Sequence, residues 1–138
     1  MATFIRPEVS KENKYWINKH RYYELKHFCL QYPNWKRAID QIRNSGRTSF
    51  LEFTPTTNLP GDPTGHLAVM SLYYSSKINL IEEIAKETDP DLSDYILRGV
   101  TEGLSYAVIK SRLNIPCSKD MYYDRYRKFF WLLSQERD

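Results

Sequence analysis

Few side chains of the kinds that perform covalent or metal chemistry occur in this sequence, and their spacing does not favour such chemistry. The histidines are His20, His27 and His66, and the cysteines are Cys29 and Cys117. His20 and His27 lie seven residues apart, which is too far for the one-turn spacing that grips a metal on a helix. Cys29 follows His27 by two residues and so falls on another helix face, which disfavours a Cys–His nucleophile. The sequence therefore predicts no enzyme, no metal site and no cofactor.

Polar and basic side chains near the C-terminus suggest nucleic-acid binding instead. Lys119 would sit at the start of a helix, where it can reach a base edge or a phosphate, and Ser118 can bind a phosphate through its hydroxyl and amide. Tyr123 can pack on a thymine methyl or contact the backbone, although a plain surface aromatic is an equal alternative. The candidate DNA contacts are, in chain order, Lys110, Arg112, Ser118, Lys119, Tyr123, Arg127 and Lys128.

The elements that must position these residues form a helix-turn-helix pattern. Ser105 can cap a helix that ends at Leu113, and the segment 114–116 interrupts it, because Asn tolerates a left-handed backbone and Pro116 disfavours a helical residue before it. Ser118 offers a second cap, followed by a helix with one apolar stripe, Tyr122, Tyr126, Phe129 and Leu133. Two helices joined by so short a turn are typical of a helix-turn-helix.

The remaining sequence divides into an N-terminal helical hairpin (1–46), a Thr/Pro-rich linker (47–65) and a C-terminal domain (66–138). Apolar spacing predicts a first helix from about Trp16 to Leu30, broken by Pro33, and a second helix that Asn34 caps. Within the linker, the segment 49–53 alternates and predicts a short extended stretch. The sequence as a whole predicts an all-α protein.

A long helix is predicted over residues 66–87, and a shorter one over residues 92–100. The long helix carries a seam of apolar residues that recur every three or four positions, Leu67, Met70, Tyr74, Ile78, Ile81 and Ala85. We expect this seam to hold the C-terminal domain together. A homodimer contact through part of the seam is the alternative.

Charge is distributed unevenly, although the formal net charge is only +3. Residues 1–47 hold 10 Lys and Arg against 4 Asp and Glu, residues 48–104 hold 3 against 9, and residues 105–138 hold 7 against 4. Two basic ends around an acidic centre suit a polyanion-binding surface, and ordinary solvated helix faces would explain the same pattern. The chain shows no signal segment and no apolar run of membrane-spanning length, so we expect a soluble, cytoplasmic protein.

Two stretches of the chain resemble a known family. YELKHFCLQYPNWKRAIDQIR and VTEGLSYAVIKSRLNIPCSKDMYYDRYRKFFWLLSQ, joined by the Thr/Pro linker and the long helix, are similar to small phage and prophage transcriptional regulators of the RinA and ArpU type. These proteins have an N-terminal helical part and a C-terminal helix-turn-helix similar to region four of sigma factors. Asn114 stands where the family usually has glycine, and Asp120 and Asp124 add negative charge to the expected DNA-facing side.

The resemblance implies a phage-derived transcriptional regulator that binds promoter double-stranded DNA in a bacterial host cell, with RNA polymerase as a further partner. From another class of function, the chain would be a phage inhibitor or adaptor that captures a host nucleic-acid-binding protein. The acidic centre of the chain favours this alternative, whereas the basic side chains of the last helix favour DNA.

Overall fold

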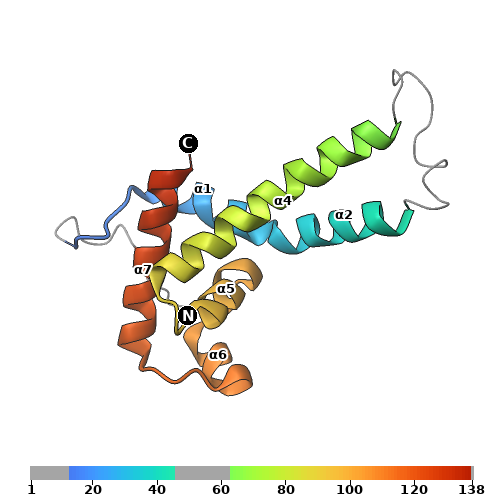
Figure 1. Cartoon of the computed structure of the whole chain (residues 1–138). Helices are drawn as coiled ribbons and strands as arrows, with labels where there is room; N and C mark the ends of the chain where they lie inside the picture. Colours follow the sequence, from blue (N-terminus) through green and yellow to red (C-terminus); the bar gives the residue numbers. More distant parts are fainter. Residues whose placement is uncertain (1–12, 46–62, 138) are drawn as a thin grey trace. The chain divides into compact units, whose positions relative to one another are not determined.

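The protein is all-α, as the sequence predicts. The computed structural model describes residues 13–45 and 63–137, and these residues contain helices and no strand (Figure 1). The expected extended stretch at 49–53 lies outside the described residues. In chain order the helices are α1 (Lys19–Leu30), α2 (Tyr32–Ser45), α4 (Pro63–Thr88), α5 (Ser93–Glu102), α6 (Tyr106–Leu113) and α7 (Lys119–Glu136).

Helix boundaries in the N-terminal part differ from the predicted ones. α1 begins at Lys19 rather than near Trp16, because the Asn18 side chain accepts a hydrogen bond from the His20 amide at 2.8 Å and so caps the helix there. The break falls at Gln31 rather than at Pro33. Pro33 lies in the first turn of α2, where a residue without an N–H group is tolerated, and Asn34 lies inside α2 and is not its cap.

The long helix α4 extends further than expected at its N-terminal end. It begins at Pro63 and ends at Thr88, directly before Asp89 and Pro90. Residues 63–65, which the predicted linker (47–65) includes, thus belong to this helix. Proline is favoured at the first position of a helix, because its missing N–H group would have no partner there in any case.

Two compact units make up the chain, and their division differs from the expected three parts. One unit comprises Met1–Gln31 with Leu80–Asp138, and we call it the C-terminal unit; the other comprises Tyr32–Asn79, and we call it the Tyr32–Asn79 unit. α1 packs against α5 and α7, far along the chain, rather than grouping with α2. α4 contributes residues to both units, so its apolar seam does not serve the C-terminal part alone.

The core of the C-terminal unit depends on a close approach between α5 and α7. A Cβ atom added at Gly99 would lie 2.1 Å from the Tyr122 hydroxyl oxygen and 3.1 Å from Cδ1 of Ile109. Tyr122 and Ile109 are themselves buried, so neither can move aside into solvent. Only glycine lets α5 approach α7 this closely, and Phe129, Phe130 and Leu133 complete the buried face of α7.

Aromatic and polar contacts fasten α1 to α7. The hydroxyl groups of Tyr22 and Tyr126 share a hydrogen bond of 2.6 Å, and the Tyr22 ring meets the Phe130 ring edge-on with centroids 5.2 Å apart. Arg21 of α1 donates to the Ser134 carbonyl at 3.1 Å and also to the Arg137 carbonyl. The last carbonyl groups of α7, which have no partner within the helix, are thus satisfied by a cation from α1.

In the Tyr32–Asn79 unit, α4 carries apolar side chains both along the predicted seam and on the side opposite to it. Lys77 lies over the Tyr73 ring at 4.7 Å and over the Trp35 ring of α2 at 5.7 Å. Val69, Leu72 and Tyr73 are exposed to 65%, 68% and 53%, on the side of α4 away from the predicted seam.

Candidate nucleic-acid interface

The corner between α6 and α7 is built from residues with fixed backbone roles. Asn114 adopts the left-handed conformation with φ 55° and ψ 50°, and its amide donates to the Lys110 carbonyl at 3.1 Å, which ends α6. Ile115 follows and is fully buried, so it anchors the turn in the core. The predicted Ser105 cap of α6 is present, with its hydroxyl oxygen accepting from the Val108 amide at 3.3 Å. Asn114 therefore performs the chain reversal for which glycine is usual.

Side chains from α6 hold the turn in place. The Tyr106 hydroxyl donates to the Cys117 carbonyl at 2.6 Å, and Lys110 Nζ donates to the Ile115 carbonyl at 3.3 Å. Both carbonyl groups belong to the turn that precedes α7. The start of α7 is thus fixed to α6 by direct hydrogen bonds, which is the rigidity that a recognition helix requires.

Ser118 caps α7, as the sequence predicts. Its Oγ accepts a hydrogen bond from the Met121 amide at 3.1 Å, and Asp120 lies in the first turn. An acid in this position interacts favourably with the positive end of the helix dipole. Ser118 and Lys119 are both exposed beside the free amide groups of the first turn. This end of α7 therefore combines a cation with exposed backbone donors, which together suit a phosphate oxygen.

Lys119, Tyr123 and Arg127 follow one another at intervals of four residues and so form a ridge along α7. The Tyr123 hydroxyl accepts a hydrogen bond from the Tyr106 amide at 3.1 Å, so this side chain joins α7 to the start of α6. Arg127 is half-buried, and its Nε is buried without a hydrogen-bond partner among the described residues. Lys128 lies about 100° around the helix from Arg127 and therefore projects from a different side.

The two candidates on α6 also diverge. Lys110 and Arg112 are two residues apart, which separates their directions by about 200°. Lys110 is held over the turn by its hydrogen bond to Ile115, whereas Arg112 is exposed. The structure therefore places Lys110 near the start of α7 and points Arg112 elsewhere on α6.

Arg125 was not predicted from the sequence to have a role, but it forms ion pairs with two acids of this region. Its guanidinium lies 2.6 Å from the Asp124 carboxylate and 2.9 Å from the Asp89 carboxylate, in the turn after α4. Asp89 is only 14% exposed, and burial alone would raise its pKa. The hydrogen bond from Arg125, with those from the Leu92 and Asp91 amides, outweighs burial and lowers the pKa of Asp89.

Asp124 is therefore charge-compensated within the fold, whereas Asp120, in the first turn of α7, faces solvent uncompensated. Among the described residues, none forms a hydrogen bond or an ion pair with the Asp120 carboxylate. The negative charge that α7 presents beside Lys119 is thus smaller than the sequence suggests.

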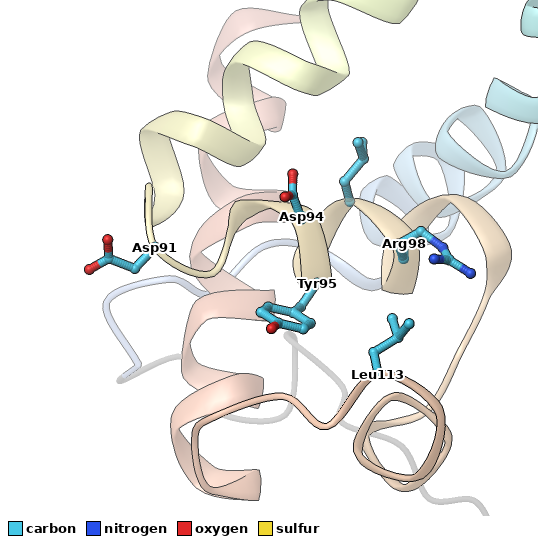
Figure 2. A pocket seen from close by; sticks show the side chains of 6 residues that line it. Asp91, Asp94, Tyr95, Arg98 and Leu113 are labelled. Carbon is cyan, nitrogen blue, oxygen red and sulfur yellow. The ribbon is translucent and has the colours of Figure 1, made fainter.

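A groove of about 590 Å³ lies in the same unit and, unlike the start of α7, is lined mainly by acidic and apolar side chains. Figure 2 shows Asp94, Tyr95 and Arg98 on α5, with Leu113 at the end of α6. Arg98 is bound by Glu102 at 2.6 Å, so its charge is already compensated. Phosphate groups would be repelled from this acidic, partly apolar surface. This groove is therefore not suited to a polyanion, in contrast to the exposed start of α7.

Other kinds of site receive little support from the described residues. Within residues 13–45 and 63–137, no three side chains of His, Cys, Asp or Glu gather closely enough to hold a metal ion. Cys29 is buried, and burial raises the pKa of its thiol. None of the helices in the described ranges combines the length and apolarity needed to cross a bilayer. Comparisons of the chain with protein-family models, curated proteins and solved structures gave no significant match.

Proposed function

We propose that this protein binds double-stranded DNA through α6, its following turn and the start of α7, and that it acts as a phage-derived transcriptional regulator at promoter DNA. The observation that carries the proposal is the fixed corner of Asn114, buried Ile115 and the Ser118 cap, which presents the exposed N-terminal end of α7. A helix presented in this way can enter the major groove with its first residues toward the bases.

The charged side chains divide between base and phosphate roles. Lys119 contacts a base edge or phosphate at the start of α7, while Arg127 and Lys128, further along, contact phosphates on either side of the groove. Tyr123 contributes mainly by joining α7 to α6 at Tyr106. Phosphate contacts supply most of the affinity, and RNA polymerase is a further partner at the promoter.

Fluorescence anisotropy tests this function. The purified chain is titrated onto a duplex from upstream of its own gene and onto a scrambled duplex, at several salt concentrations. We expect preference for the upstream duplex and a salt slope of several phosphates, with about 0.9 in the slope for each phosphate contact. Lys119→Ala should lower affinity and reduce the slope by about 1, whereas Lys86→Ala, which removes an exposed lysine of α4, should change neither. Absence of binding to both duplexes near about 100 mM salt would overturn the proposal.

A second candidate is a protein-binding inhibitor or adaptor, and one observation favours it. Val69, Leu72 and Tyr73 form an exposed apolar stripe on α4, of the kind that marks a protein contact. Replacing Leu72 with Ser should leave DNA binding unchanged if the stripe serves a protein partner. Loss of DNA binding in Leu72→Ser would instead place the stripe in the DNA-binding function.

A further inference from the structure

The first turn of α7 exposes two neighbouring side chains that phosphate binding does not require. Asp120 is exposed and carries a negative charge, and Met121 is 40% exposed although it is apolar. The cap bond from the Met121 amide to Ser118 Oγ, at 3.1 Å, fixes the backbone that carries both side chains. Their directions from the helix are therefore set by the same corner that positions Lys119.

A structural role explains these two residues only in part. Asp120 interacts favourably with the helix dipole, but any acid in the first turn would do so equally. Asp124, one turn later, is bound by Arg125 at 2.6 Å, whereas among the described residues no cation binds Asp120. Met121 does not belong to the buried stripe of α7, so core packing does not account for it.

We propose that Asp120 and Met121 determine which bases this protein reads, with Asp120 accepting a hydrogen bond from the exocyclic amino group of cytosine and Met121 packing on the methyl group of thymine. This inference rests on the proposed DNA-binding function. An ionised carboxylate is only an acceptor, and in the major groove the cytosine N4 amino group is the donor that Asp and Glu characteristically bind. The thymine methyl is the apolar group exposed in that groove.

The negative charge of Asp120 has a second consequence. It repels phosphates, so it weakens binding to every duplex that does not offer the matching amino group. Discrimination then comes partly from a penalty on the wrong site, rather than only from attraction to the right one. Removing this charge should therefore strengthen binding to unrelated DNA while it weakens the preference for the selected site.

The test is a selection of duplexes from a random-sequence pool by the full chain, followed by anisotropy titrations. The variants are Asp120→Asn, Met121→Ala and, as a matched control, Glu136→Gln, which removes one exposed acid at the other end of α7. Thermal melts establish that each variant is folded before selection.

We expect the wild type to select a site in which one fixed position is cytosine, read by Asp120, and another fixed position is thymine, read by Met121. Asp120→Asn should prefer cytosine about tenfold less than the wild type at its position, and the base selected there should shift toward adenine. Its affinity for a scrambled duplex should be at least that of the wild type. Replacing the contacted thymine with uracil should weaken wild-type binding about fourfold and leave Met121→Ala unaffected. The site selected by Glu136→Gln should match that of the wild type.

Two outcomes would contradict the inference and can be told apart. A wild-type site that is enriched but is the same in Asp120→Asn and Met121→Ala would overturn base readout by these residues, while leaving DNA binding intact. A wild type that enriches no sequence and binds neither duplex would overturn the proposed function as well.

Discussion

The two sides of α7 differ in chemistry and in what they contact. Its inner side places Tyr122, Phe129, Phe130 and Leu133 in the core, and Tyr122 lies against Gly99 of α5. Its first turn carries Lys119, Asp120 and Met121, which are exposed, and we call these three residues its outer side. One helix thus holds the unit together with aromatic rings and presents a different set of side chains outward. We therefore expect substitutions on the inner side to change stability, and substitutions on the outer side to change binding.

The largest effect should follow from Gly99→Ala. The added methyl group would lie 2.1 Å from the Tyr122 hydroxyl oxygen, so α5 and α7 would have to separate. We expect a loss of about 3 kcal/mol in the free energy of unfolding, measured by urea denaturation. Adding Tyr122→Phe removes the clashing oxygen and should recover part of the loss. If the double variant is no more stable than Gly99→Ala, the close approach is not the cause.

A smaller loss is expected from Tyr126→Phe. This change removes the 2.6 Å hydrogen bond to the buried Tyr22 hydroxyl between α1 and α7 while it keeps the ring. The expected cost is about 1.5 kcal/mol in the same denaturation measurement. The double variant Tyr22→Phe with Tyr126→Phe should be less destabilised than the sum of the two single changes, because neither hydroxyl is then left in the core. Additive losses would argue that the two hydroxyls do not interact.

Asp89→Asn tests the link between Arg125 and the turn after α4. The pKa of Asp89 is lowered in the folded state, so the carboxylate adds stability above its ordinary pKa, and this stability is lost as the pH falls through the lower folded-state pKa. Asparagine keeps the side-chain oxygen that accepts from the Leu92 and Asp91 amides.

At neutral pH the wild type should therefore be more stable than Asp89→Asn by roughly 1 kcal/mol, and the difference should shrink as the pH falls below the ordinary pKa of an aspartate. Melting curves of both proteins between pH 7 and pH 3 measure this. A difference that does not depend on pH would show that the charge of Asp89 does not contribute.

The smallest effect on stability should come from Lys119→Ala on the outer side. Lys119 is exposed, so the free energy of unfolding should change by no more than about 0.5 kcal/mol. A larger loss of stability would show that the outer side of α7 also supports the fold. Urea denaturation alongside Tyr126→Phe gives the direct comparison of the two sides.

Local features of this fold could be predicted from the sequence, because neighbouring residues determine them. The caps Ser105 and Ser118 and the left-handed Asn114 depend on backbone groups within a few positions, and all three occur as predicted. Tyr122, Phe129 and Leu133 of the predicted stripe of α7 are buried, as helical periodicity indicates, whereas Tyr126 is half-buried. The all-α fold class follows from the same kind of pattern along the whole chain.

Contacts between distant residues could not be predicted in this way. Arg125 and Asp89 are separated by 36 positions, and Tyr22 and Tyr126 by 104. The contact of Gly99 with Tyr122 depends on how α5 packs against α7. The grouping of α1 with α5 and α7 has the same origin, since apolar spacing shows that a helix has a buried side without showing what covers it.

The most direct test of DNA recognition by α7 is to map the residues that DNA touches. Amide chemical shifts of the isotope-labelled full chain would be followed while a duplex from upstream of its gene is added. We predict that the largest changes occur between Asn114 and Asp124, with little change along the acidic groove of α5 or along Val69, Leu72 and Tyr73 of α4. Changes concentrated on that groove or on the α4 stripe, or no changes anywhere, would contradict DNA recognition by the outer side of α7.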